Sequence, residues 1–260
     1  MGVIAIRAQG VGKRFVRGAT PAGSSLKEAL YSRVRAQSGQ IQPGQIQASW
    51  VLHDVSATIF QGEVVGLLGA NGAGKSTLLK LIGGVMRPTA GELGVRGQVG
   101  LLLQDGTGFH PDLTARENVL LRGALLGLSR RQVTDRLADI VDFADAKDVI
   151  DQPVKHLSTG MRMRLGWSVA VHALPDIYLM DEVLSVVDAA FRNRCLDHMG
   201  AGRSRARTVL IVSHDLSILE RVCSRILWLD RGRVVADGDD VPGLLGRYRQ
   251  SAGEAASVEG

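Results

Sequence analysis

Cysteine, aromatic residues and long apolar runs are all scarce in this 260-residue chain, and each shortage excludes a class of protein. The two cysteines, Cys195 and Cys223, have no metal-ligand spacing, so we expect neither a disulfide framework nor a zinc site and interpret both as packing thiols. No run approaches the roughly 18 uncharged apolar residues that a membrane-spanning helix needs, and residues 1–10 lack the form of a signal peptide. We therefore expect a protein that stays in the cytoplasm.

The charge balance leaves the partner open at first. The net charge is +5, which is compatible with nucleic acid, with an anionic membrane surface or with an ordinary solvated surface. Aromatic residues make up 4% of the chain and are not interleaved with the arginines, which are dispersed. Proteins that hold single-stranded nucleic acid combine a basic groove with stacking aromatics. We therefore expect no nucleic-acid partner.

The segment Gly-Ala-Asn-Gly-Ala-Gly-Lys-Ser-Thr, residues 69–77, has the pattern of a phosphate-binding loop. Residues 63–68 before it are aliphatic, as in a buried parallel strand, and residues 78–82 after it open an apolar helix. Glycines let successive backbone N–H groups point at phosphate oxygens, and the helix adds its positive N-terminal end. We expect Lys75 to reach the β- and γ-phosphates and Ser76 to ligate Mg²⁺. A glycine-rich turn that matches by accident does not explain the flanking strand and helix.

Polar side chains follow directly after several apolar runs that are expected to form strands. Residues 176–182 read Asp-Ile-Tyr-Leu-Met-Asp-Glu, and the two final acids suit a Mg²⁺ ligand, Asp181, and a base that activates water, Glu182. Alone, such a pair would be interpreted as an exposed loop or a helix cap, but the phosphate loop favours the catalytic role. His214 follows a β-branched strand and Gln104 another apolar run, so we expect both near the γ-phosphate and Mg²⁺.

The N-terminal region reads as strand, connector and strand. Residues 3–7 alternate as an edge strand would, and residues 10–15 are expected to turn out of it. Phe15 precedes the phosphate loop and suits stacking on adenine, although a single phenylalanine is also a common core residue.

Residues 18–47 shift in composition toward Gly, Ser, Gln and Arg. Within this stretch, the spacing of Leu26, Leu30 and Val34 predicts a short helix, and Lys27, Arg33 and Arg35 make it basic. Such a helix suits an anionic membrane surface or a partner helix, and equally a solvated connector. Residues 107–151 have helical periodicity, and the nucleotide-binding part is expected to resume near Pro175.

The segment Leu157-Ser158-Thr159-Gly160-Met161 resembles the Leu-Ser-Gly-Gly-Gln signature of ATP-binding cassette (ABC) proteins. The resemblance covers about residues 5–237 and implies an α/β phosphate-loop ABC ATPase core, a mixed, mostly parallel sheet with helices, with an antiparallel β subdomain and an inserted helical subdomain. It implies ATP and Mg²⁺ as cofactors. It also implies a head-to-tail dimer with a second copy of the chain, in which the signature of one copy grips the γ-phosphate held by the other.

The family roles fall on particular residues. Glu182 and His214 would be catalytic, and Ser76, Gln104 and Asp181 would hold the metal. The expected nucleotide contacts are Phe15, Gly69, Asn71, Gly72, Ala73, Gly74, Lys75, Ser76, Thr77, Gln104, Ser158, Gly160 and Asp188.

Further cues resemble the ATPase subunits of polysaccharide and teichoic-acid exporters. They are Met161, residues 181–191, residues 106–111, the Arg116-Glu117-Asn118 run and the basic insertion. This resemblance implies export of lipid-linked polysaccharide of the O-antigen, galactan or teichoic-acid type, an integral membrane permease dimer as partner, and a place on the cytoplasmic face of the membrane. The alternatives are an ABC ATPase of another transporter class, or one that acts in DNA repair or translation.

The expected organisation is a single nucleotide-binding domain over residues 1–250. Within it we expect a gate helix in the insertion 18–47, where it can meet an anionic membrane surface, and a helical subdomain over 105–174. Residues 251–260 are polar and are expected to form a disordered tail. The chain is expected to end too soon for the carbohydrate-binding domain that some O-antigen relatives carry.

Overall fold

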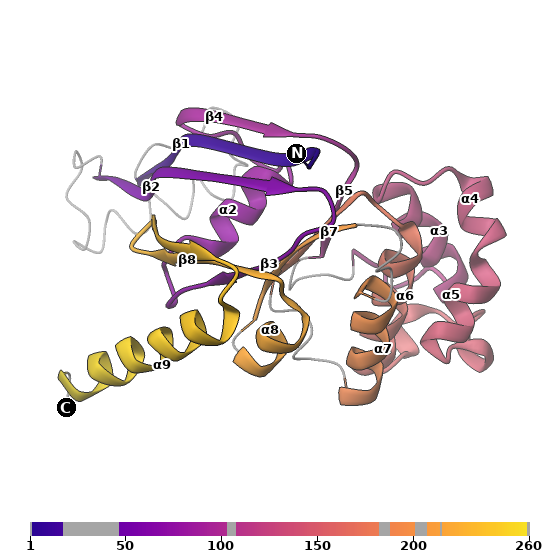
Figure 1. The fold of residues 1–260 in the computed structure, drawn as a ribbon. Helices are drawn as coiled ribbons and strands as arrows, with labels where there is room; N and C mark the ends of the chain where they lie inside the picture. Colours follow the sequence, from indigo (N-terminus) through magenta and orange to yellow (C-terminus); the bar gives the residue numbers. More distant parts are fainter. Residues whose placement is uncertain are drawn as a thin grey trace, which may run out of the picture.

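A computed structural model describes residues 2–17, 47–102, 108–181, 188–200, 207–213 and 215–258. Its strands form a three-stranded sheet in the order β2-β1-β4 and a six-stranded sheet in the order β5-β6-β7-β3-β8-β9 (Figure 1). The strands are β1 (Ile4–Arg17), β2 (Gln47–Phe60), β3 (Val64–Leu68), β4 (Ala90–Val95), β5 (Val99–Leu102), β6 (Ile177–Asp181), β7 (Thr208–Val212), β8 (Arg225–Asp230) and β9 (Arg233–Gly238). The helices are α2 (Lys75–Ile82), α3 (Ala115–Leu125), α4 (Arg130–Asp135), α5 (Leu137–Ala144), α6 (Thr159–Ala173), α7 (Ala189–Gly200), α8 (Leu216–Val222) and α9 (Val241–Val258), with short 3₁₀ turns η1 (Lys147–Val149) and η2 (Val154–His156).

The six-stranded sheet is parallel except for β9, which pairs antiparallel with β8. Strands β6 and β7 are buried at every position, because side chains that alternate along a strand meet a covered face on both sides. In β6, Ile177 and Leu179 pack toward α2 and the small sheet, while Tyr178 and Met180 pack toward α6, α7 and α8. The mostly parallel sheet that the sequence predicts is therefore confirmed.

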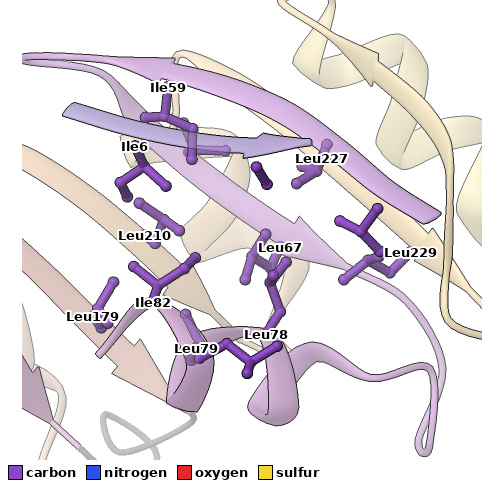
Figure 2. Close-up of a cluster of buried hydrophobic side chains, with 14 of the residues drawn as sticks. Ile6, Ile59, Leu67, Leu78, Leu79, Ile82, Leu179, Leu210, Leu227 and Leu229 are labelled. Atoms are coloured by element: carbon purple, nitrogen blue, oxygen red, sulfur yellow. The ribbon is translucent and has the colours of Figure 1, made fainter. Parts of the chain in front are cut away.

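Helix α2 lies between the two sheets and carries the phosphate loop at its N-terminus (Figure 1). Figure 2 shows the core that fixes it. Leu78, Leu79 and Ile82 of α2 pack against side chains from both sheets. The sheet residues are Ile6, Ile59, Leu67, Leu179, Leu210, Leu227 and Leu229. Because this contact is apolar and continuous, the start of α2 is held rigidly at the carboxyl end of β3.

Helices α3 to α6 form a separate lobe with its own buried core, which includes Val119, Val133, Ile140 and Leu165 (Figure 1). Two of its helices begin at capping boxes, in which the side chain of the N-cap residue and that of the third helical residue each accept a backbone hydrogen bond. The pairs are Thr114 with Glu117 and Ser129 with Gln132. The predicted helical insertion is thus confirmed, and β6 follows it at Ile177.

Asn118, the last residue of the Arg116-Glu117-Asn118 run, has a structural role in the helical lobe. Its side chain is fully buried, and its Oδ1 accepts from the backbone N–H of His110 at 2.7 Å. Its Nδ2 donates to the carbonyl oxygens of His110, Leu113 and Thr114 at 3.0 to 3.1 Å. The amide therefore holds the loop before α3 against that helix.

Replacing Asn118 with alanine is expected to lower the free energy of unfolding by about 2–4 kcal/mol, because several buried backbone groups lose their partner. Urea unfolding of the full chain measures this. The control is Asn193→Ala, since Asn193 is exposed and its Oδ1 accepts from Arg221 at the surface, and it should change stability by less than about 0.5 kcal/mol. Equal effects of the two substitutions would contradict the clamp.

Strand β1 corrects two predictions. It is the middle strand of the small sheet, paired with β2 on one side and β4 on the other, so the edge-strand prediction is wrong. The expected turn after Gly10 is also wrong, because the strand continues to Arg17. Gly10 has φ +60°, and the register shifts between Ala8 and Val11, so the chain forms a β-bulge at Gly10. Strand pairing continues beyond this bulge, where the sequence predicts a turn.

The C-terminal part of the chain also differs from the prediction. Helix α9 extends to Val258, so the segment expected to be a disordered tail is helical as far as that residue. Alanines and Glu254 continue the helix because they are strong helix formers, a preference that the polar composition of the segment obscured.

The thiols agree with their interpretation as packing residues: both are free, and burial raises the pKa of each to about 12. Within the described part of the chain, no helix combines the length and the apolarity needed to cross a bilayer.

Candidate nucleotide site

The phosphate loop connects the carboxyl end of β3 to α2 in a conformation that requires glycine. Gly74 has φ +104°, and a Cβ there would lie 2.5 Å from Cδ2 of Leu52 and 3.1 Å from the carbonyl oxygen of Val51. Gly72 has φ +80°, but a Cβ there would meet none of the described residues within 4 Å. Gly69, Ala73 and Gly74 are buried, whereas Asn71, Gly72 and Ser76 are exposed and Thr77 is half-buried. The loop thus has a closed inner side and an open outer side that can receive phosphates.

Lys75 is the buried cation of this site. Only 7% of its surface is exposed, and its Nζ donates to the carbonyl oxygens of Gly69 at 2.6 Å and Ala70 at 2.9 Å. The ammonium group therefore lies under the loop, within reach of any anion that the loop holds. A buried ammonium beside phosphates forms charge-assisted hydrogen bonds, which are stronger than neutral ones.

The N-terminus of α2 has the properties of an anion site. Gly74 is the N-cap residue, and no side chain caps the helix. The first N–H groups of a helix lack partners within it, and they carry the positive end of its dipole. The two features suit a phosphate held between the loop and α2.

Asp181 lies at the carboxyl end of β6, at the sheet edge where parallel strands commonly bind ligands. Its side chain is 8% exposed, and its Oδ1 is buried with no hydrogen-bond partner among the described residues. A buried carboxylate oxygen without a partner is costly unless a cation or ordered water satisfies it. Mg²⁺ prefers oxygen ligands. The Asp181 carboxylate and the hydroxyl of the exposed Ser76 are both oxygen ligands, so the two residues fit the metal. The described residues contain no cluster of three or more His, Cys, Asp or Glu side chains that would form an all-protein metal site.

Phe15 lies near the end of β1, where it pairs with Ser49 of β2. Its ring is 39% exposed, and the ammonium of Lys13 lies 5.5 Å from its centre, so the two side chains share one face of β1. Lys13 pairs with Leu52, the residue that a Cβ on Gly74 would touch. The register shifts between Lys13 and Arg14, and stacking of adenine on Phe15 stays a prediction.

Ser158 is the N-cap of α6, and its Oγ accepts from the backbone N–H of Met161 at 3.1 Å. Leu157 beside it is buried, whereas Ser158, Thr159 and Gly160 are exposed. Among the residues that the structure describes, a Cβ on Gly160 would meet only the Ser158 hydroxyl, at 4.0 Å, so these residues leave the surface in front of the helix start open. Helix α6 belongs to the helical lobe, whereas the phosphate loop lies with α2 in the other part of the molecule (Figure 1). The structure of one chain therefore does not bring the signature residues to its own loop.

Asp188 has partners within the chain. One carboxylate oxygen accepts from the backbone N–H of Phe191 at 2.8 Å and caps α7, and the other lies 3.3 Å from Nε of Arg164. The hydrogen bond from Phe191 is the main cause that lowers the pKa of Asp188, and Arg164 adds to it. The predicted contact of Asp188 with nucleotide stays a prediction.

Comparison with known proteins identifies the family. Residues 52–185 match the family model described as ABC transporter. The chain is 41% identical over 212 residues to the O-antigen export system ATP-binding protein RfbB of Klebsiella pneumoniae, covering 82% of this chain and 85% of that protein. The chain belongs to the ABC transporter family.

Other members of the ABC transporter family are longer than the segment they share with this chain. The ABC transporter protein AbcA of Aeromonas salmonicida is 45% identical over 72% of this chain, which spans 61% of that protein. The teichoic acids export ATP-binding protein TagH of Listeria monocytogenes serotype 4b is 40% identical over 73% of this chain, which spans 56% of TagH. Among solved structures, a dimeric ATP-binding cassette in a post-hydrolysis state with ADP and Pi superposes with a TM-score of 0.68 at 22% identity, over 90% of this chain and 98% of that one. That similarity establishes the fold.

For this ABC transporter chain, several predicted residues lie outside the described ones. They are Gln104, Glu182, His214 and the gate-helix residues 18–46. Their roles therefore remain predictions from the sequence.

The structure adds supporting residues that sequence reasoning missed. The β8–β9 turn supports the phosphate loop, because Gly232 N–H donates to the carbonyl of Ala73 at 3.1 Å, and a Cβ on Gly69 would lie 2.2 Å from the carbonyl oxygen of Leu229. The Arg-Gly pair at this turn gives a local turn signal, but nothing in the sequence indicates which loop it contacts. The contact of Arg164 with Asp188 had no sequence signal either.

Proposed function

We propose that this chain is the ATP-hydrolysing subunit of an exporter that moves lipid-linked polysaccharide of the O-antigen, galactan or teichoic-acid type across the cytoplasmic membrane. The observation that carries the proposal is the 41% identity, over 82% of the chain, to a protein named for O-antigen export. The similarity to TagH, named for teichoic acid export, extends it to a polyol-phosphate polymer. The shared chemistry of these cargoes is a long polar polymer on a lipid carrier at the cytoplasmic leaflet.

In this mechanism each site residue has one task. Phe15 stacks on adenine, and the N–H groups of the phosphate loop and Lys75 hold the phosphates. Ser76, Gln104 and Asp181 would hold Mg²⁺, which would supply positive charge beside the phosphates. Glu182 takes a proton from the attacking water, and His214 contacts the γ-phosphate.

The partner of the site is a second copy of the chain in head-to-tail arrangement. The exposed Ser158 cap and the open space in front of Gly160 support this, because the signature of one copy is free to approach an anion on the other. Two sites then close on two ATP molecules, and hydrolysis reopens them.

An integral membrane permease dimer is the second partner, with this chain bound at the cytoplasmic face of the membrane. The helical lobe has its own core, which supports a role as a rigid unit that transmits closure to the permease. ATP supplies the free energy for this movement, so transport should require a hydrolysis-competent chain.

Co-expression tests the proposal. The chain is expressed with the membrane protein encoded beside its own gene, extracted in detergent and purified, and the ATPase rate is measured with and without lipid-linked glycan. We expect a stable complex whose rate responds to the glycan, and no response in a Glu182→Gln control. A chain that purifies alone and responds instead to DNA or ribosomes would contradict the export role and favour a non-transport ABC ATPase. A response to a drug or an imported solute would favour another transporter class.

The basic insertion gives a second test of the export proposal. Changing Arg33 and Arg35 together to Glu is expected to reduce transport several-fold more than ATPase activity, because like charge repels the helix from anionic lipid. The matched control is Arg247→Glu with Arg249→Glu, since these arginines have the same spacing on α9 and are both exposed. Transport into vesicles that contain anionic lipid is the measurement. An unaltered transport rate in the Arg33 and Arg35 variant would remove the membrane role.

A further inference from the structure

Three helices meet at a cluster of charged and aromatic side chains outside the nucleotide site. Its members, which we name the Arg164 cluster, are Phe143, Asp145, Arg164, Asp188, Phe191 and Arg194. Phe143 and Asp145 come from the end of α5, Arg164 from α6, and the remaining three from the start of α7 or directly before it. Figure 1 shows α5, α6 and α7 in one part of the molecule. The cluster therefore joins the helix that begins at the signature to the segment that ends at Asp188.

Arg164 bridges two carboxylates. Its Nη1 lies 3.1 Å from Oδ2 of Asp145, and its Nε lies 3.3 Å from Oδ2 of Asp188. The side chain is 25% exposed, so these pairs are only partly screened by solvent. Its guanidinium also lies 5.1 Å from the centre of the Phe191 ring, which is fully buried. The planar fork of an arginine presents separate N–H groups to the two acids in fixed directions, whereas a lysine offers a single, compact point charge.

Arg164 and Asp188 form an ion pair but no hydrogen bond. The Nε atom is buried and forms no hydrogen bond to any described residue, although Asp188 lies 3.3 Å away. A buried donor without a well-aligned acceptor is unfavourable, and a small movement of Asp188 toward Arg164 would remove that cost. Asp188 is anchored to α7 through Phe191 N–H, and its lowered pKa keeps it anionic.

Arg194 shares Asp145 and the Phe191 ring with Arg164, contacts Phe143 in addition, and forms no ion pair with Asp188 among the described residues. It lies 3.6 Å from the same Asp145 oxygen, donates to the carbonyl of Phe143, and lies 4.9 Å and 5.5 Å from the rings of Phe143 and Phe191. It comes from α7, the helix that Asp188 caps, whereas Arg164 comes from α6. Arg194 thus strengthens the same packing but does not connect the signature helix to Asp188. The chain itself therefore offers a matched control.

We propose that Arg164 is a positioning residue for ATP hydrolysis, which sets the helix carrying Ser158 and Gly160 relative to Asp188 as two copies close on nucleotide. Arg164 acts through Asp188 and α6 and does not touch the nucleotide. The proposal rests on the head-to-tail dimer proposed above. Loss of Arg164 should therefore impair dimer closure and turnover while leaving the binding of ATP to a single chain unchanged.

The test compares Arg164→Met with Arg194→Met in the full-length chain. We expect Arg164→Met to lower kcat and to raise the ATP concentration needed for dimerisation by about threefold to fivefold, the upper range for a partly exposed ion pair. The Kd of a fluorescent ATP analogue for the single chain should stay the same. Arg194→Met should lower Tm by a similar amount but change kcat and dimerisation by less than about twofold. Arg164→Lys, which keeps the charge but reaches one acid, should recover part of the loss.

Dimerisation is measured by light scattering in a Glu182→Gln background, so that hydrolysis does not dissolve the dimer. If Glu182→Gln alone forms no dimer with ATP, the proposed dimer fails. If that parent dimerises and Arg164→Met dimerises equally well, the positioning role of Arg164 is wrong. Equal losses of kcat in Arg164→Met and Arg194→Met would show that the cluster contributes stability alone, and a loss of ATP affinity parallel to kcat would also overturn the inference.

Discussion

Replacing Glu182 with glutamine is expected to slow ATP hydrolysis by roughly 10²- to 10⁴-fold, the usual contribution of a positioned general base. Glutamine has nearly the same shape but cannot take the proton of the attacking water, so ATP binding should persist. The full chain is assayed for phosphate release at saturating Mg-ATP, and nucleotide affinity is measured separately. Because hydrolysis no longer releases the two copies, an ATP-dependent dimer should accumulate.

The neighbouring acid provides the control for Glu182→Gln. Asp181→Asn removes one of the two proposed protein ligands of Mg²⁺ that the structure describes, so its activity loss should diminish as the Mg²⁺ concentration rises. The loss in Glu182→Gln should not respond to Mg²⁺, because proton transfer and not metal binding is missing. Near wild-type hydrolysis in Glu182→Gln would show that another group activates the water.

Replacing Lys75 with methionine is expected to weaken Mg-ATP binding by roughly 10²- to 10⁴-fold, because charge-assisted hydrogen bonds to two phosphates are lost. Methionine keeps most of the apolar stem, which matters because Lys75 is only 7% exposed and its stem packs inside the protein. The phosphate loop also loses the two hydrogen bonds from Nζ to its carbonyl oxygens. A thermal unfolding curve therefore accompanies the titration with ATP, so that lost affinity is not confused with lost folding.

Lys80→Met is the matched control for Lys75→Met, since Lys80 belongs to the last turn of the same helix. Its charge favours the C-terminal end of α2 by at most about 1 kcal/mol, and it lies at the end opposite the loop. ATP affinity should stay within about twofold of the unmodified chain. Equal loss of affinity in both variants would mean that α2 itself, and not the Lys75 ammonium, had been damaged.

The phosphate loop and its surroundings could be predicted because their determinants are local. The glycine pattern, the aliphatic strand before it and the apolar helix after it lie within residues 63–82. The structure confirms β3 and α2 on either side of the loop. Likewise Ser158 could be recognised as a helix start from its own neighbours, because capping involves residues within one turn.

Other features could not be predicted because they depend on which segments meet. Alternation in β1 indicates which side chains face the core, but not how many strands pair with it, so the edge-strand prediction failed. The four hydrogen bonds of Asn118 join it to a loop whose path no local pattern specifies. The tail prediction failed for a different reason: composition was given more weight than helix propensity.

The sequence by itself determined the chemistry of this protein: a phosphate loop with Lys75, two acids at a strand end, a signature at a helix start, and through them the ABC family. These signals survive in a single sequence because each requires fixed residue types at short spacing. Only the tertiary structure decided that Oδ1 of Asp181 is buried without a partner among the described residues, that Lys13 pairs with Leu52 across the small sheet, and that Arg164 joins Asp145 to Asp188. Such relations arise when distant segments pack together, and burial and distance are properties of that packing, so they cannot be calculated from neighbours along the chain.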